Sequence, residues 1–212
     1  MPFLHYENLS PSACWGLWQI AEPESQLLPQ LSAFIDHQEL ALLAHPAKRL
    51  EWLSVRALCL ELLGKKSLPL ADISKDAFGK PYLVNQVAHL SFSHAGHWAV
   101  VALDRASPIG IDIERASPAI DRVAPRLFSQ SELQQAPTLD RKTIFWCAKE
   151  AIYKLHGERG LDFKRQISLQ WHENRFYGEL LIHSTSQIAC IARPWEDHWV
   201  VIATPLILPS EI

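Results

Sequence analysis

Two segments of the chain carry apolar residues at the spacing that predicts an amphipathic helix. The first segment covers residues 50–63 and is followed by Gly64, and the second covers residues 143–156 and is followed by Gly157. Apolar residues recur there at intervals of three and four, which gathers them on one helix face. Because a glycine just beyond a helix is a common terminator, we expect the two helices to end at these glycines.

Each predicted helix is followed by two segments with the character of β-strands. These are residues 89–94 and 97–102 in the first half, and residues 187–192 and 198–203 in the second. They are rich in apolar and β-branched side chains, and the second strand of each pair begins with His-Trp. The order of predicted elements is therefore the same in the two halves.

The predicted helices also match residue by residue. Trp52 and Trp146 are separated by the same number of positions as Arg56 and Glu150. We infer a duplication and predict an α+β fold. It would be a pseudo-dimer of two similar α+β subdomains, each a helix packed on an antiparallel sheet, with the active site at the seam.

We place the predicted subdomains at residues 1–106 and 107–212. The crossover would lie at Ala106-Ser107-Pro108, because proline interrupts regular structure.

Composition and charge narrow the class of protein. The chain has 212 residues, of which 48% are hydrophobic, and this is enough for a substantial core. A net charge of −3 argues against a nucleic-acid partner bound through bulk charge. No apolar run approaches a membrane span, and the N-terminus does not resemble a signal peptide. The 4 cysteines lack zinc-site spacing, so we expect reduced thiols in a cytoplasmic protein.

The segment 109–114 alternates apolar and acidic residues. In a strand, Ile111 and Ile113 would share one face, and Asp112 and Glu114 would share the other. Two like charges on one face repel each other, which a cation or a basic side chain between them would relieve. The alternative is a solvated strand face, and the pair of acids alone favours that alternative.

A third acid changes this balance. Trp146, Glu150 and Lys154 follow one another at four-residue spacing beside the apolar stripe of the second helix. They could form only an ordinary Glu–Lys surface pair, worth about 0.2–0.5 kcal/mol. The functional interpretation is that Asp112, Glu114 and Glu150 surround a metal ion such as Mg²⁺, and that Lys154 contacts a phosphate.

Five segments, in order along the chain, resemble the 4′-phosphopantetheinyl transferases of the surfactin-synthetase-activating (Sfp) type. They are Gly79-Lys80-Pro81, residues 90–94, residues 110–114, Phe128-Ser129 with Glu132, and residues 146–151 with Lys154. The family's Ser-His-Ser is Ser93-His94-Ala95 here, a departure that keeps the histidine. The resemblance thins before about residue 30 and after about residue 170.

The resemblance implies an enzyme of the holo-acyl-carrier-protein synthase type. Such an enzyme transfers phosphopantetheine from coenzyme A to a serine of an apo acyl-, polyketide- or peptidyl-carrier protein and releases adenosine 3′,5′-bisphosphate. The first half would bind coenzyme A, and the second would carry the metal-binding acids and the catalytic helix. The family is built as a pseudo-dimer, whose two halves could supply the interface within one chain, so we expect a monomer. From the net charge and the short apolar runs we expect no nucleic-acid or membrane partner.

The resemblance also implies roles for single residues. Asp112, Glu114 and Glu150 would be the Mg²⁺ ligands. Lys154, Lys80, Ser93 and His94 would contact coenzyme A, and Arg49, with Lys48 and Arg56 less firmly, would lie near its adenosine 3′-phosphate. Asp112, Glu150 and Lys154 would be the catalytic residues. Glu150 or a water that it holds would take the serine proton, with Glu132 as the second candidate.

Several alternatives stay open at this point. Lys80 fits an exposed turn, Arg49 and Arg56 fit a helix surface, and Ser129 with Glu132 fits a helix capping box. The basic segment 157–165 is either a surface loop or a docking edge for an acidic carrier. Mn²⁺ could replace Mg²⁺. A protein that only binds coenzyme A or a carrier, and a Mg²⁺-dependent hydrolase of nucleotide diphosphates, are the competing functions.

Overall fold

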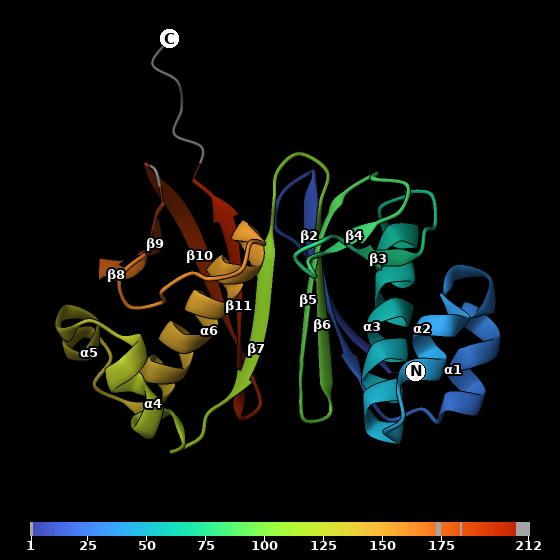
Figure 1. Ribbon diagram of the computed structural model, residues 1–212, viewed down its shortest axis with the longest axis horizontal. Helices are drawn as coiled ribbons and strands as arrows, with labels where there is room; N and C mark the ends of the chain where they lie inside the picture. The colour runs from blue at the N-terminus through green and yellow to red at the C-terminus, as the bar shows by residue number, and fades with distance from the viewer. Residues whose placement is uncertain (1, 173–174, 183, 207–212) are drawn as a thin grey trace, which may run out of the picture. The chain divides into compact units, whose positions relative to one another are not determined.

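The computed structural model describes residues 2–172, 175–182 and 184–206. The chain divides into two compact units, Met1–Ala106 and Ser107–Ile212. Each unit combines helices with antiparallel sheet (Figure 1), which confirms the predicted α+β class. Among the described residues, no helix is long and apolar enough to cross a membrane.

The first unit has one long helix against a four-stranded sheet of order β1-β2-β6-β5. A small β3-β4 hairpin lies beside β5. The elements are β1 (Phe3–Asn8), β2 (Ala13–Gln19), α1 (Glu24–Leu31), a 3-10 turn (Ser32–Phe34), α2 (His37–Leu42), α3 (Pro46–Lys65), β3 (Ile73–Lys75), β4 (Pro81–Leu83), β5 (His89–Ala95) and β6 (Trp98–Asp104).

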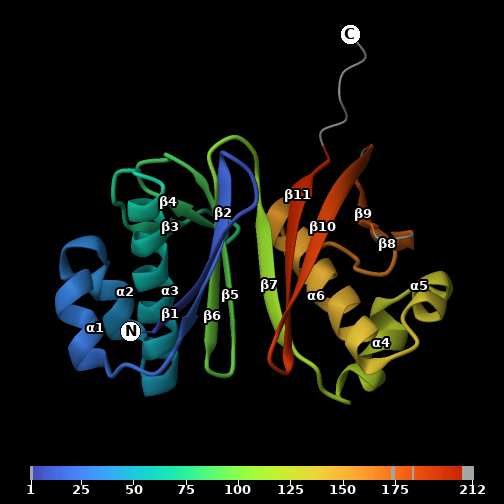
Figure 2. The ribbon, with the colours of Figure 1, turned by 180° about the vertical axis from the view of Figure 1, so that it is seen from behind.

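The second unit has a five-stranded sheet of order β7-β11-β10-β9-β8, and its long helix lies over β7 and β11. Figure 2 shows the sheet from the other side. The elements are β7 (Gly110–Arg115), α4 (Ile120–Leu127), α5 (Gln130–Gln135), α6 (Leu139–His156), β8 (Ile167–His172), β9 (Arg175–Leu181), β10 (Thr185–Trp195) and β11 (His198–Pro205).

The two units repeat one order of elements. In each, a strand is followed by two short helices, a long helix and two hairpins, and the strand order β2-β6-β5 matches β7-β11-β10. The register agrees as well, because Trp98 lies opposite Gln19 while Trp199 lies opposite Glu114. The first unit differs in its additional strand β1 and in its β3-β4 hairpin, which forms a separate sheet, whereas β8 and β9 belong to the main sheet of the second unit. This likeness supports the inferred duplication.

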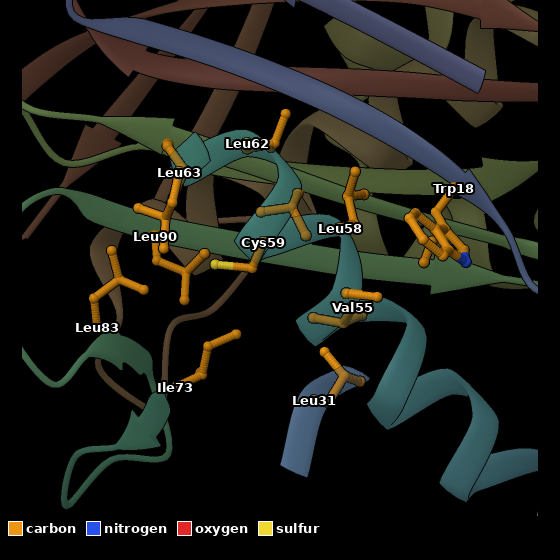
Figure 3. Close-up of a cluster of buried hydrophobic side chains, with 14 of the residues drawn as sticks. Trp18, Leu31, Val55, Leu58, Cys59, Leu62, Leu63, Ile73, Leu83 and Leu90 are labelled. Carbon is orange, nitrogen blue, oxygen red and sulfur yellow. The ribbon is translucent and has the colours of Figure 1, made fainter. Parts of the chain in front are cut away.

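The helix α3 seals the core of the first unit. Leu58 and Leu62 are fully buried on its apolar face, among the side chains drawn in Figure 3. The expectation that Gly64 ends this helix is wrong, since α3 runs to Lys65. The left-handed turn that follows is made by Ser67, whose φ is 54°. The predicted strand start at His97 is also one residue early, since β6 begins at Trp98.

The helix α6 seals the core of the second unit. It begins after Thr138, whose side chain caps it by accepting from the backbone N–H of Arg141, and it ends before Gly157 with φ 87°. The predicted end of this helix is therefore confirmed. Phe145 is fully buried and packs against Phe176, with ring centroids 5.2 Å apart.

Candidate functional site

The acidic face of β7 lies against α6. Gly110, Asp112 and Glu114 share this face by their alternation along the strand. A Cβ at Gly110 would lie 1.9 Å from the carbonyl oxygen of Ala151, so only glycine lets the helix approach this closely. Ile111 and Ile113 point to the opposite face and are buried. The predicted division of acids and isoleucines between two faces is thus confirmed.

Asp112 is joined to the helix by an ion pair. The Nζ of Lys154 donates to Oδ1 of Asp112 at 2.6 Å. The Asp112 side chain is 4% exposed and that of Lys154 is 28% exposed. A solvated strand face is therefore excluded for Asp112, and Lys154 pairs with this strand acid.

Glu114 is oriented by a residue one turn before Glu150 on α6. The indole Nε1 of Trp146 donates to Oε1 of Glu114 at 3.0 Å. The spacing Trp146, Glu150, Lys154 therefore sets a row of side chains along β7, with contacts to Glu114 at one end and to Asp112 at the other. The structure brings the predicted acids and lysine to one helix–strand contact.

The three carboxylates at the contact between β7 and α6 repel one another. Burial raises the pKa of Glu114 to about 7, and the negative charges of Asp112 and Glu150 add to the shift. Burial, followed by the charge of Asp112, likewise raises the pKa of Glu150 to about 7. Lys154 lowers both pKa values but does not cancel the rise. The negative charge that Glu114 and Glu150 gain on ionisation is therefore unfavourable at this site.

This charge predicts a pH-dependent stability. The ordinary carboxyl pKa is 4.5 and the folded value is about 7 for both Glu114 and Glu150. The folded protein therefore binds more protons between these values, so its free energy of unfolding falls as the pH rises through that window. Thermal unfolding should show a midpoint that decreases from pH 4.5 to pH 7. Excess Mg²⁺ should reduce the decrease, and a Glu150→Gln variant should flatten it even without the ion.

The donor set fits a hard divalent cation. Within the described part of the chain, no three acidic, histidine or cysteine side chains already form a cluster that could hold a metal ion. Asp112, Glu114 and Glu150 nevertheless interact electrostatically at the contact between β7 and α6. Carboxylate oxygens are the ligands that Mg²⁺ prefers. Their assignment as metal ligands stays a prediction.

The acids belong to the second unit alone. In the aligned registers, Leu17 and Gln19 of β2 take the places of Asp112 and Glu114. Arg56 takes the place of Glu150 in the aligned helices. The duplicated scaffold thus carries its acidic site only once.

The residues predicted to contact coenzyme A lie in the first unit. His94 is on β5, with its Nε2 3.5 Å from Oε2 of Glu51, an atom that also accepts from Lys48. Ser93 is its buried neighbour on the same strand. Lys80 closes the turn before β4, and burial lowers the pKa of its ammonium. Since β4 lies beside β5, these residues come from neighbouring segments. Their contacts to coenzyme A stay predictions.

The two predicted arginines are held by the fold itself. The Arg49 guanidinium binds both carboxylate oxygens of Glu24 and the backbone oxygen of Leu40, which ties α3 to α1 and α2. These contacts give Arg49 a structural role, and a contact with the adenosine 3′-phosphate stays a prediction.

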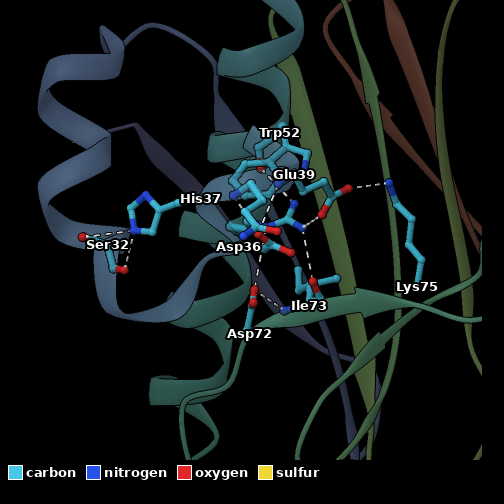
Figure 4. Close-up of polar contacts among 10 residues, drawn as sticks. Ser32, Asp36, His37, Glu39, Trp52, Asp72, Ile73 and Lys75 are labelled. Atoms are coloured by element: carbon cyan, nitrogen blue, oxygen red, sulfur yellow. Dashed lines mark hydrogen bonds and ion pairs between the residues drawn. The ribbon is translucent and has the colours of Figure 1, made fainter. Parts of the chain in front are cut away.

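Arg56 is 3% exposed and lies 3.3 Å above the ring of Trp52. Its guanidinium donates to Glu39 and to the backbone oxygen of Ile73, among the polar contacts of Figure 4. A purely exposed position on the helix surface is therefore excluded for Arg56.

Glu132, the second candidate base, has a structural role. It forms the predicted capping box with Ser129, and its side chain is buried. Its Oε1 accepts from Lys149 and from the backbone N–H of Leu169, both at 2.9 Å, while Oε2 accepts from Ser129 N. Sequence reasoning missed Lys149, whose side chain is fully buried. In the sequence, the burial of Lys149 is indicated only by its place directly after the apolar residues Cys147 and Ala148.

The basic segment 157–165 is partly anchored. Phe163 packs on Trp146 and Tyr153, with ring centroids 5.6 Å and 5.4 Å apart. Lys164 donates to the backbone oxygen of Pro125 on α4. Arg159 and Arg165 remain exposed. The segment is thus a surface loop with an apolar anchor, and its role as a docking edge stays a prediction.

Comparison with known proteins shows which proteins the segment carrying this site is similar to. Residues 108–203, a little under half of the chain, match the 4′-phosphopantetheinyl transferase superfamily. This span contains Asp112, Glu114, Glu150 and Lys154. The match confirms the resemblance that the motifs predict.

Three curated proteins that are similar to this chain are each named as 4′-phosphopantetheinyl transferases. The chain is 34% identical over 137 residues to the 4′-phosphopantetheinyl transferase ffp of Bacillus subtilis, covering 59% of each protein. It is 39% identical over 88 residues to another 4′-phosphopantetheinyl transferase of Bacillus subtilis, covering 38% of the chain and 39% of the relative. It is 36% identical over 92 residues to the transferase Sfp of Bacillus subtilis strain 168, covering 40% and 41%. The alignments therefore span less than two thirds of these relatives.

Proposed function

We propose that this chain transfers the 4′-phosphopantetheine group of coenzyme A to a serine hydroxyl of an apo acyl- or peptidyl-carrier protein. The reaction is Mg²⁺-dependent, takes place in the cytoplasm and releases adenosine 3′,5′-bisphosphate. The observation that carries this proposal is the contact between β7 and α6, where a buried Asp112–Lys154 pair lies with two further carboxylates. The segment that matches the superfamily contains this contact, and the names of the relatives support the transfer.

Asp112, Glu114 and Glu150 are the residues that would hold the metal ion. Bound Mg²⁺ supplies positive charge that neutralises the diphosphate and stabilises the leaving oxygen. Trp146 fixes Glu114, and Lys154 fixes Asp112, so two of the three acids are oriented before any substrate arrives. Because these two acids are already oriented, little rearrangement of their side chains would be needed when the metal ion binds.

Lys154 has a second task in this proposal. Its ammonium donates to Oδ1 of Asp112 at 2.6 Å. The side chain is 28% exposed, so it can reach a phosphate oxygen while it stays beside the acid. A fixed positive charge there would stabilise the negative charge on the oxygens of the transferred phosphoryl group and on the leaving oxygen.

Glu150 is the proposed proton acceptor. The serine Oγ forms a bond to the phosphorus next to the pantetheine arm, and the bond from that phosphorus to the bridging oxygen breaks. The bridging oxygen leaves with adenosine 3′,5′-bisphosphate. The serine proton moves to a carboxylate oxygen of Glu150, either directly or through a water that Glu150 holds. Glu132 is disfavoured because both of its oxygens already accept hydrogen bonds.

The carrier would approach the face made by segment 157–165 and α4. Arg159 and Arg165 are exposed on the segment, and Arg122 and Arg126 are exposed on α4. Lys164 joins the two elements through the backbone oxygen of Pro125. Exposed positive charge steers an acidic partner and favours its encounter.

Release of adenosine 3′,5′-bisphosphate tests the proposal. The protein is incubated with coenzyme A and Mg²⁺, with and without apo carriers of the fatty-acid, polyketide and peptide type. We expect the bisphosphate only when a suitable carrier is present, in an amount equal to the modified carrier. Release without a carrier would instead show a hydrolase, and binding of coenzyme A without release would show a binding protein.

A further inference from the structure

Lys149 is a buried ammonium whose bonds lead away from the acids on β7. Its side chain is 0% exposed, although its neighbour Glu150 belongs to the candidate site. Its Nζ lies 2.9 Å from Oε1 of Glu132 and donates to the backbone oxygens of Phe163 and Ile167, each at 2.6 Å. An ammonium has three N–H donors, so all of them are engaged.

The Lys149–Glu132 pair joins three elements. Glu132 lies on α5, Lys149 lies on α6, and Oε1 of Glu132 also accepts from the backbone N–H of Leu169 on β8. A buried ion pair costs desolvation, and a well-packed apolar pair often stabilises a core as much. Stability alone therefore does not account for ions here. The pair also holds the backbone between Phe163 and Ile167 in position, because Lys149 donates to the backbone oxygens of both residues.

That backbone carries a side chain toward the site. The Phe163 ring packs on Trp146 at 5.6 Å and on Tyr153 at 5.4 Å between centroids. The Trp146 indole in turn donates to Glu114. An unbroken series of contacts thus runs from Lys149 through Phe163 and Trp146 to Glu114.

We propose that the Lys149–Glu132 pair positions Glu114. By holding the backbone oxygen of Phe163, Lys149 keeps the Phe163 ring against Trp146, and this fixes the indole that binds the Glu114 carboxylate. Lys149, Phe163 and Trp146 are then positioning residues. The consequence for catalysis rests on the proposed transferase function, whereas the positioning itself does not.

The test measures solvent exchange of the Trp146 indole N–H by NMR, with the signal assigned through a Trp146→Phe variant. In Phe163→Ala we expect exchange about tenfold faster, which corresponds to the loss of roughly one hydrogen bond's contribution. Phe163→Tyr should restore the slow exchange, because the tyrosine ring can occupy the same place. The indole of Trp15, which donates to Glu7 in the first unit, should be unchanged in every variant and serves as the internal reference.

Lys149→Met should have the same effect on the Trp146 indole as Phe163→Ala. If Lys149→Met does not fold, Phe163→Ala still tests the ring contact on Trp146 on which the proposal depends, since Phe163 is half-buried and outside the ion pair. Ser168→Ala is the matched control, because it changes an exposed side chain beside the clamped backbone. Wild-type exchange of the Trp146 indole in a folded Lys149→Met variant, or in Phe163→Ala, would overturn the proposal. A wild-type protein without transferase activity would contradict the proposed function only, because the indole result does not depend on activity.

Discussion

Asp112→Asn is expected to lower the rate of phosphopantetheine transfer by about 10²- to 10³-fold, the range typical for loss of one preorganised charged group. Asparagine keeps the shape of aspartate but removes the charge that binds Lys154 at 2.6 Å and that would bind Mg²⁺. Folding should change little, because loss of the ion pair is offset by relief of the repulsion that Asp112 exerts on Glu114 and Glu150. Initial rates and thermal unfolding measure the two effects separately.

Asp121→Asn is the matched control for this variant. Asp121 also pairs with a lysine of α6, Lys142, at 2.6 Å, but its side chain is 54% exposed. Exposed pairs contribute little, so this variant should keep both rate and stability. A near-normal rate for Asp112→Asn in saturating Mg²⁺ would show that the metal-ligand assignment is wrong.

Gly110→Ala is expected to destabilise the protein by about 3 kcal/mol, at the upper end of the usual cost of overpacking. The new Cβ would lie 1.9 Å from the backbone oxygen of Ala151 and 2.9 Å from the backbone nitrogen of Leu155. Backbone atoms cannot turn aside as a side chain can, so α6 would have to move away from β7. That shift would also separate Lys154 from Asp112 and reduce transfer in whatever protein still folds.

Gly64→Ala provides the comparison for Gly110→Ala. Gly64 lies inside α3, and a Cβ there would meet no atom within 4 Å. Alanine favours the helix over glycine, so we expect a gain of about 0.5–1 kcal/mol. Chemical denaturation of both variants measures the two free energies of unfolding. Equal stabilities would contradict the close helix–strand contact at Gly110.

Local patterns predicted the acidic face of β7 and the course of α6. Alternation along residues 109–114 separates Asp112 and Glu114 from the isoleucines, and four-residue spacing aligns Trp146, Glu150 and Lys154. Both relations depend only on the periods of a strand and a helix. The end of α6 at Gly157 was predictable for the same reason, since the left-handed residue directly follows the apolar pattern.

Long-range partners were not predictable in this way. Arg49 and Arg56 resemble exposed cations in the sequence, but their partners Glu24 and Glu39 lie on other helices. The pairing of Lys149 with Glu132 likewise depends on how α5 packs beside α6. Local periodicity does not encode such packing. The predicted end of α3 at Gly64 is wrong because this glycine lies inside the helix, and Ser67 makes the left-handed turn instead.

The intact mass of a carrier protein tests the central claim most directly. An apo carrier is incubated with the protein, coenzyme A and Mg²⁺, beside a carrier whose acceptor serine is replaced by alanine. We predict a mass gain of one phosphopantetheine group on the serine carrier, none on the alanine carrier, and a strongly reduced gain with the Asp112→Asn enzyme. No gain on any of the fatty-acid, polyketide and peptide carriers, with coenzyme A left intact, would contradict the account.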